Sequence, residues 1–206
     1  AASVIWPAFR SAGVWWSVGP GFLWKIILST VLVAASGYVV NDIFDQKTDS
    51  INRPSRQVVG VVLSKKSGFQ IYILLIISIL GLVALIFEQS SPEAKRLDLW
   101  IFPGIAAALF LYAWLLKGTP FLGNILIAVF CGAVPLLVFF QEKRPLQVLE
   151  MYRPDKALLV RWLVFGYAFF AVATTFLREI VKDLEDLPGD TAAKLRTAPI
   201  VFGETI

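Results

Sequence analysis

The sequence contains no histidine and a single cysteine, Cys131, among its 206 residues. The absence of histidine excludes histidine-based acid–base catalysis and most zinc or haem sites. One cysteine cannot form a disulfide within the chain, and its position inside an apolar block predicts a small core residue. Charged residues make up only 17% of the chain, against about 25% in an average soluble domain. The chain therefore has too little polar surface for a typical water-soluble domain.

Apolar residues make up 57% of the sequence, and the mean hydropathy is +0.72. They occur in long blocks, each close to the roughly 20 residues that a helix needs to cross a bilayer. The blocks lack the alternation of barrel strands, so helices are the expected spanning elements. The predicted spans are Phe22–Val40, Gln70–Phe87, Leu99–Leu116, Phe121–Phe140 and Leu158–Leu177. The prediction is an all-α, multi-span transmembrane bundle that forms one membrane-embedded domain over residues 1–206.

Two of the polar segments between or after the spans carry acidic clusters. Segment Asn41–Phe69 follows the first span, and segment Arg178–Arg196 follows the fifth. An even number of crossings separates them, so both segments should lie on the same membrane face. That face holds ten Lys and Arg residues against seven on the other face after the first span, which favours a cytoplasmic position. The net charge of +4 forms no basic stripe, so nucleic acid is not an expected partner.

In the first cluster, Asp42, Asp45 and Asp49 are spaced i, i+3 and i+7. On one helix, this spacing places the three carboxylates within about 60° of one another. Carboxylates so close together resist ionisation unless a cation lies among them. Magnesium is the expected cation, because it prefers hard oxygen ligands and completes its coordination with phosphate and water.

The second cluster repeats this spacing with Asp183, Asp186 and Asp190. The pair Pro188-Gly189 is expected to end the helix, so that Asp190 would stand on a turn. Arg178 and Lys182 lie beside the acidic residues and are suited to bind phosphate oxygens. One such cluster alone is typical of a solvated loop. Two clusters with matching spacing on one face indicate a shared site for metal and phosphate.

These segments resemble the two acidic signatures of the UbiA-type intramembrane prenyltransferases. The first motif, Asn-Asp-x-x-Asp-x-x-x-Asp with a following Asn-Arg-Pro-x-Arg, is matched by Asn41, Asp42, Asp45, Asp49, Asn52, Arg53, Pro54 and Arg56. The second motif, Asp-x-x-x-Asp, is matched by Asp186 and Asp190. A less specific third element is matched by Tyr112, Leu116, Lys117, Gly123 and Asn124. The sequence around the second motif looks most like the branch that alkylates geranylgeranylglyceryl phosphate.

The resemblance implies a bundle of nine helices around a central cavity, of which this chain looks like a partial copy without most of the first helix and about the last three. It also implies transfer of a prenyl group from a prenyl diphosphate to a lipid-phosphate or aromatic acceptor, with magnesium-assisted loss of diphosphate. The implied metal ligands are Asp42, Asp45, Asp49, Asp183, Asp186 and Asp190. The implied diphosphate-binding residues are Asn41, Arg53, Arg56, Lys117, Arg178 and Lys182. The implied catalytic residues are Asp42, Asp45, Asp186, Tyr112 and Lys182.

Three other functions stay open at this point. A cation transporter or channel could use paired acidic clusters, although such sites normally lie near the bilayer midplane rather than at span ends. A phospholipid head-group transferase also uses paired Asp motifs, but its Asp-Gly-x-x-Ala-Arg pattern does not occur in the sequence. A non-catalytic family member would keep the fold without the reaction.

Overall fold

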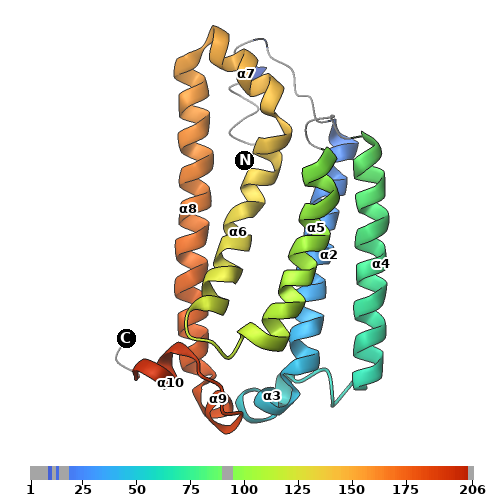
Figure 1. Cartoon of the computed structure of the whole chain (residues 1–206), viewed down its shortest axis with the longest axis vertical. Helices are drawn as coiled ribbons and strands as arrows, with labels where there is room; N and C mark the ends of the chain where they lie inside the picture. The colour runs from blue at the N-terminus through green and yellow to red at the C-terminus, as the bar shows by residue number, and fades with distance from the viewer. Residues whose placement is uncertain (1–8, 11–12, 14–18, 90–94, 204–206) are drawn as a thin grey trace.

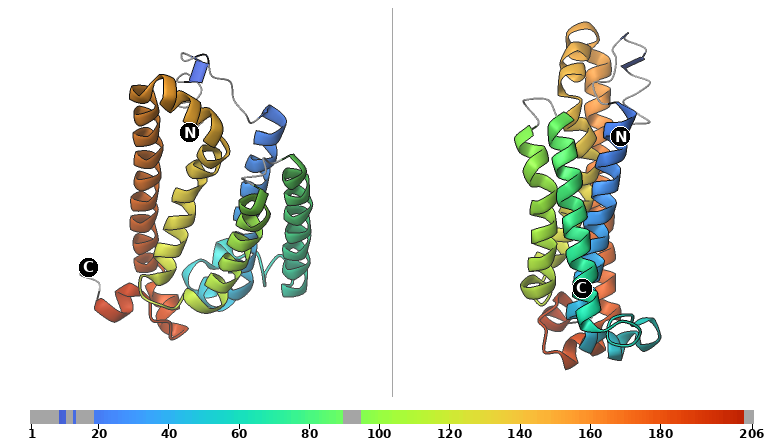
Figure 2. Two further views of the ribbon diagram at one scale, coloured as in Figure 1. Left: turned by 45° about the horizontal axis from the view of Figure 1, so that its top comes forward. Right: turned by 90° about the vertical axis from the view of Figure 1, so that its right-hand side faces the viewer.

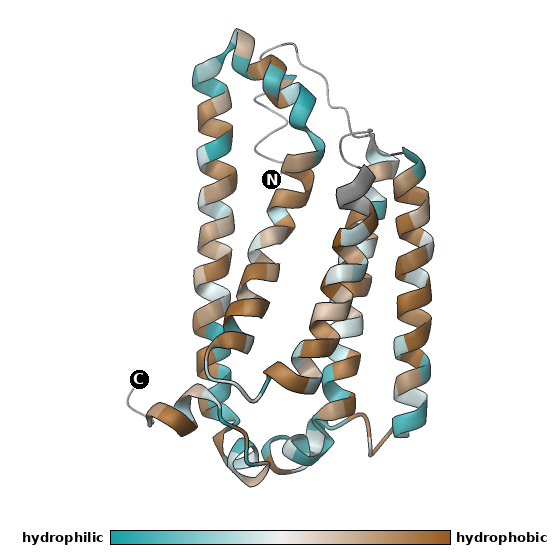
Figure 3. Ribbon diagram, viewed as in Figure 1, coloured by the Kyte–Doolittle hydropathy of each residue, from teal (hydrophilic) through white to brown (hydrophobic). Residues whose placement is uncertain are grey.

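The computed structural model describes residues 9, 10, 13, 19–89 and 95–203. Five of the described helical segments are long and apolar enough to cross a membrane. They are α2 (Pro20–Phe44), α4 (Lys65–Gln89), α5 (Lys95–Leu111) with the turn Tyr112–Leu116, α6 (Leu122–Gln141) and α8 (Pro154–Glu185). These helices stand side by side in one bundle, and apolar residues predominate along them (Figures 1 and 3). The all-α, multi-span prediction is confirmed.

The central parts of the predicted spans agree with the structure, but several of their ends do not. Helix α2 continues past Val40 to Phe44, and α8 runs from Pro154 to Glu185 rather than from Leu158 to Leu177. The expected polar loops also contain short helices, which lie at the ends of the bundle. These elements are α3 (Gln46–Asn52), the 3-10 turn Pro54–Arg56, α7 (Lys143–Tyr152), α9 (Leu187–Ala192) and α10 (Ala198–Phe202). The predicted loop Glu88–Asp98 lies partly outside the described residues.

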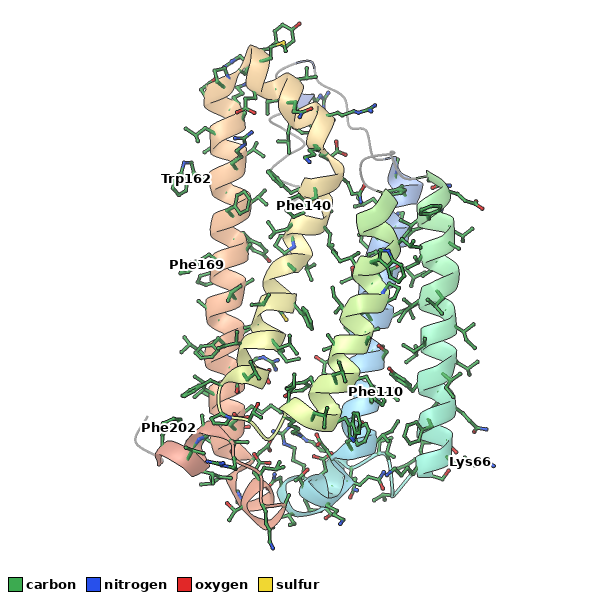
Figure 4. All side chains as sticks on the ribbon, in the orientation of Figure 1. Lys66, Phe110, Phe140, Trp162, Phe169 and Phe202 are labelled. Atoms are coloured by element: carbon green, nitrogen blue, oxygen red, sulfur yellow. The ribbon has the colours of Figure 1, made fainter. Side chains whose placement is uncertain are left out.

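The spanning helices form two packed groups. In one group, α2, α4 and α5 bury residues such as Val33, Val83 and Phe102 against one another. In the other, α6 packs closely on α8 at Gly132, where an added Cβ would lie 2.3 Å from Cγ2 of Val172. Trp162 and Phe169 point away from the bundle on the outer side of α8 (Figure 4). Their exposed fractions of 71% and 75% fit side chains that face lipid.

Both acidic clusters lie at the same end of the bundle, as the count of crossings predicted. Helix α2 leads into α3, α8 leads into α9, and α3 packs against α9. Figures 1 and 2 show these short helices next to each other at the end opposite α7. The bundle therefore brings together two segments that are about 140 positions apart in the sequence.

Candidate functional site

Each acidic cluster is built at a junction between a long helix and a short one. Asp45 lies between α2 and α3, with φ −86° and ψ 4°. Asp186 lies between α8 and α9, with φ −87° and ψ 1°. The two junctions have nearly the same backbone conformation, so each one directs its chain from a spanning helix into a short helix at the end of the bundle.

These junctions correct two predictions. Asp42, Asp45 and Asp49 do not share one helix, because α2 ends at Phe44 and Asp49 belongs to α3. The segment Pro188-Gly189 does not end a helix either. Pro188 lies in the first turn of α9, where its missing N–H breaks no helical hydrogen bond. Asp190 is consequently inside α9 and only 2% exposed, instead of standing on a turn.

Two residues at the end of α3 tie the junctions together. Arg53 Nη2 lies 3.2 Å from Oδ1 of Asp186 and 3.5 Å from Oε2 of Glu185. Asn52 Nδ2 donates to the backbone carbonyl of Asp186 at 3.0 Å, and the N–H of Gly189 donates to Asn52 Oδ1 at 2.8 Å. The sequence matched Asn52 to a motif but gave it no role, because its partners lie in the other acidic segment.

A cavity of about 600 Å³ lies beside the junctions, between α2, α5, α6 and α8. This volume is within the range of about 300–1,000 Å³ that is usual for small-molecule sites. We call its ionic end, next to α3 and α9, the cavity floor. The floor is formed by Asn41, Asp42, Asp45, Asp49, Arg53, Arg56, Arg178, Lys182 and Asp186. These nine were predicted site residues, and the fold brings them together. Gln57, Glu179 and Glu185 also line the cavity and were not predicted.

The rest of the cavity wall is mainly apolar and extends into the bundle. It includes Val33, Phe102, Ile105, Leu109, Phe130 and Leu137. Tyr112 lies in the wall near the floor, and Cys131 lines the cavity and is exposed. The prediction of Cys131 as a buried core residue was therefore wrong, because its side of α6 faces the cavity.

Three predicted site residues are not part of the described cavity wall. Lys117 pairs with the carboxylate of Asp45, to which the Asn41 side chain also donates. The second residue is Asp183, whose Oδ2 accepts a hydrogen bond from Asn124 Nδ2 at 2.9 Å. The third residue, Asp190, is buried in α9. In this structure Lys117 is thus a counter-ion of the first junction, and Asp183 is held by a neighbouring amide.

The floor and its surroundings carry more carboxylates than their cations fully compensate. Burial raises the pKa of Asp49, and the nearby carboxylate of Asp45 raises it further, while Lys117 acts in the opposite direction. Burial raises the pKa of Asp190 to about 6, with Lys117 lowering it and the carboxylates of Asp186, Asp183 and Asp45 raising it. An added cation near the floor would relieve this repulsion.

The oxygen donors of the first junction suit a hard divalent cation. Asn41 Oδ1 is buried and has no hydrogen-bond partner among the described residues, and Asp42, Asp45 and Asp49 lie in the same wall. No three His, Cys, Asp or Glu side chains in the described part of the chain form a set that could hold an ion alone. Magnesium is compatible with such a site, because it commonly uses one or two carboxylates together with phosphate and water.

Tyr112 is positioned by a local irregularity at the end of α5. The residues Tyr112–Leu116 form a π-helical turn, in which the N–H of Lys117 donates to the Tyr112 carbonyl at 2.9 Å. Gly123 lies so close that an added Cβ would be 2.7 Å from Cε2 of the Tyr112 ring. Turns of this kind are frequent at functional sites. Gly123 is therefore a site-shaping residue that the sequence identified only as part of the third, less specific element.

The chain matches the family model of the UbiA prenyltransferase family over residues 4–206. It is similar to proteins named digeranylgeranylglyceryl phosphate synthase from Methanopyrus kandleri (33% identical), Methanobrevibacter smithii (31%) and Thermococcus sibiricus (34%). The similar regions cover 85%, 87% and 86% of this chain. They cover 56%, 58% and 55% of the relatives, so the chain spans little more than half of their length. No solved structure matched the chain.

Proposed function

Because the chain belongs to the UbiA prenyltransferase family, we propose that it transfers a prenyl group from a prenyl diphosphate to a lipid acceptor in the membrane. The observation that carries this proposal is the division of the cavity into two zones. Its floor has the charges to bind a diphosphate, and its apolar walls suit an isoprenoid chain. A lipid phosphate is a better acceptor candidate than an aromatic compound, because the similar proteins are named for a glyceryl phosphate product.

The cations of the floor would bind the diphosphate oxygens. Arg53 and Arg56 approach from the first acidic segment, and Arg178 and Lys182 approach from the second. Hydrogen bonds between such cations and phosphate are about twice as strong as those between neutral groups. Lys117 is assigned a different role, because it pairs with Asp45 and holds that carboxylate in place.

Magnesium would be held by Asp42, Asp45 and Asp49 from one junction and by Asp186 from the other, with Asn41 Oδ1 as a further oxygen donor. When bound, the ion supplies neutralisation of the charge that develops on the departing diphosphate. Asp183, which is bonded to Asn124, and the buried Asp190 are assigned supporting roles behind the floor.

The reaction breaks the bond between C1 of the donor and its diphosphate oxygen, which leaves with the electron pair. The resulting allylic cation would form near the Tyr112 ring, and an aromatic face stabilises a cation by about 0.5–2 kcal/mol. The acceptor hydroxyl oxygen then bonds to C1, and its proton passes to the released diphosphate. The apolar walls keep out water, which would otherwise capture the cation.

We place the floor on the cytoplasmic side, because this face has more Lys and Arg residues in the sequence. Cation transport is the less well supported alternative. The acidic residues lie at helix ends beside arginine and lysine, whereas transported cations usually bind near the bilayer midplane. A non-catalytic role would leave the ionic floor without a function.

The proposal can be tested by titrating the chain in lipid nanodiscs with geranylgeranyl diphosphate, in magnesium or in excess chelator. We expect magnesium-dependent binding that weakens at least about tenfold in Asp42→Ala and Asp186→Ala. Asp155→Asn, at the opposite end of α8, should bind like the wild type. Mass spectrometry with a prenylated glyceryl phosphate as acceptor would detect the product. Equal diphosphate binding in chelator would contradict the magnesium role. Cation flux across sealed proteoliposomes, without diphosphate binding, would favour transport.

A further inference from the structure

We propose that Asn52 caps helix α9 from the neighbouring helix α3, and that this cap keeps the Asp186 carboxylate available to the cavity floor. Asn52 would then be a positioning residue that sets the geometry of the two acidic junctions. The inference rests on the proposed function, because it concerns how that site is held in its working arrangement.

The first turn of α9 needs a hydrogen-bond acceptor. The N–H groups in the first turn of any helix have no partner within the helix, and an Asp at the N-cap usually accepts one of them through its side chain. Asp186 is the N-cap residue of α9, but its side chain makes no such bond. Pro188 has no N–H, and the N–H of Gly189 donates instead to Oδ1 of Asn52 at 2.8 Å.

The same amide also fixes the backbone of the N-cap residue itself. Asn52 Nδ2 donates to the Asp186 carbonyl at 3.0 Å, so one side chain satisfies a donor and an acceptor at the start of α9. The carboxylate of Asp186 is consequently free of capping. It faces the cavity floor and lies 3.2 Å from Nη2 of Arg53.

Gly189 makes this contact possible. An added Cβ at this position would lie 2.4 Å from Asn52 Nδ2 and 2.7 Å from its Oδ1, closer than real side chains approach. Any larger residue would therefore push the amide away from α9. Asn52 and Gly189 act as a matched pair, one from each acidic segment.

Loss of the Asn52 amide would leave the N–H of Gly189 without an acceptor. The nearest replacement in a helix start is the carboxylate of the N-cap residue, so Asp186 would turn back toward its own helix and away from the floor. Residues that orient ligands in this way typically contribute about 10–100-fold to metal affinity or activity.

The first test is titration of inorganic diphosphate into the chain in nanodiscs, with magnesium present. Asn52→Ala should bind about tenfold more weakly than the wild type, or worse. Ser50→Ala is the matched control, because it also removes a side-chain hydrogen bond in α3, from Ser50 Oγ to the Lys47 carbonyl, but does not reach α9. This control should keep wild-type affinity. Wild-type affinity in Asn52→Ala would overturn the proposal.

A double-mutant cycle tests the pairing directly. Gly189→Ala alone should weaken diphosphate binding about as much as Asn52→Ala, because its methyl group displaces the amide. The double variant Asn52→Ala/Gly189→Ala should be no weaker than Asn52→Ala, since the displaced group is already gone. Losses that multiply in the double variant would show that the two residues act independently, which overturns the proposal.

A distance measurement separates this inference from the proposed function. Spin labels at Lys47→Cys and Ala192→Cys, two exposed positions on α3 and α9, would be placed in a Cys131→Ser background. Electron paramagnetic resonance should give a narrow distance distribution in the wild type and in Ser50→Ala, and a broader one in Asn52→Ala. If no variant binds diphosphate, the proposed function fails while this measurement still tests the cap. An unchanged distance distribution in Asn52→Ala would overturn the proposal that Asn52 caps α9.

Discussion

Arg53 and Asp186 are 133 positions apart in the chain, yet Nη2 of the arginine lies 3.2 Å from Oδ1 of the aspartate. This ion pair crosses from one acidic junction to the other. Because both side chains line the cavity, a bound diphosphate would compete with Asp186 for the guanidinium, and a bound cation would compete with Arg53 for the carboxylate. The pair therefore links the two junctions in the absence of ligand.

Replacing Arg53 with Gln should weaken magnesium-dependent diphosphate binding about tenfold, because a charge-assisted contact to phosphate is lost. The free energy of unfolding should change by less than about 1 kcal/mol, because the Arg53 side chain is 38% exposed and such pairs contribute little to stability. Calorimetric titration and chemical unfolding would measure the two effects. Arg153→Gln, which removes an exposed pair with Asp155 at the opposite end of the bundle, is the control. Unchanged diphosphate affinity in Arg53→Gln would refute a phosphate-binding role.

Lys117→Met should destabilise the fold by about 3–5 kcal/mol, because it leaves the Asp45 carboxylate buried without its counter-ion. The side chains of Lys117 and Asp45 are only 15% and 7% exposed, so water cannot replace the lost partner. The double variant Asp45→Asn/Lys117→Met should recover most of this stability, since it removes both charges. Unfolding in mixed detergent would measure all three proteins. A double variant as unstable as Lys117→Met would contradict the pairing.

Asp190 should make stability depend on pH between about 4 and 6. Its pKa rises from 3.8 to about 6 in the folded chain, mainly through burial, so the folded state holds more protons in this window. The contribution of Asp190 to the free energy of unfolding therefore falls as the pH rises through the window, and it levels off above about pH 6. In Asp190→Asn that decrease should be smaller, although Asp49, whose pKa is also raised, still contributes. Identical pH profiles for the two proteins would contradict the assignment.

Gly132→Ala should destabilise the packing of α6 on α8 by about 1–3 kcal/mol, because the added methyl overpacks the interface. The new Cβ would lie 2.3 Å from Val172 Cγ2 and 2.9 Å from the carbonyl oxygen of Ala168. Gly166→Ala on α8 is a matched control, since its Cβ would meet nothing within 4 Å. Chemical unfolding of both variants would compare them. Equal stability for the two would show that Gly132 is not a close-packing position.

The sequence located the spanning helices and both acidic segments because hydrophobic length and charge spacing are local properties. The helix breaks at Asp45 and Asp186 could not be predicted from such local properties. The i to i−4 hydrogen bonding continues through both residues, from Asp45 N to Asn41 O and from Asp186 N to Lys182 O, and neither position carries a glycine or proline. The change of direction comes from packing at the end of the bundle, which local patterns do not encode.

The contacts of single site residues were harder to predict than the site itself. Lys117 was expected to bind diphosphate, which stays a prediction. Its pairing with Asp45 was not foreseen, because it depends on how the α5–α6 turn meets the first junction. Asn52 acts on atoms 134 and 137 positions away, so no spacing rule could pair them. The predicted roles of the floor residues in metal binding and catalysis stay predictions, whereas their convergence on one cavity follows from the fold.

Helix α8 is 32 residues long, which corresponds to about 48 Å at a rise of 1.5 Å per residue. The hydrocarbon layer of a bilayer is only about 30 Å thick, so α8 is longer than the layer, and we expect its charged last turns, with Arg178 and Lys182, to extend beyond it. A helix that exceeds the layer adapts to thinner or thicker membranes by tilting. Because these turns form part of the cavity floor, we expect bilayer thickness, and with it the lipid composition of the membrane, to influence the geometry of the site.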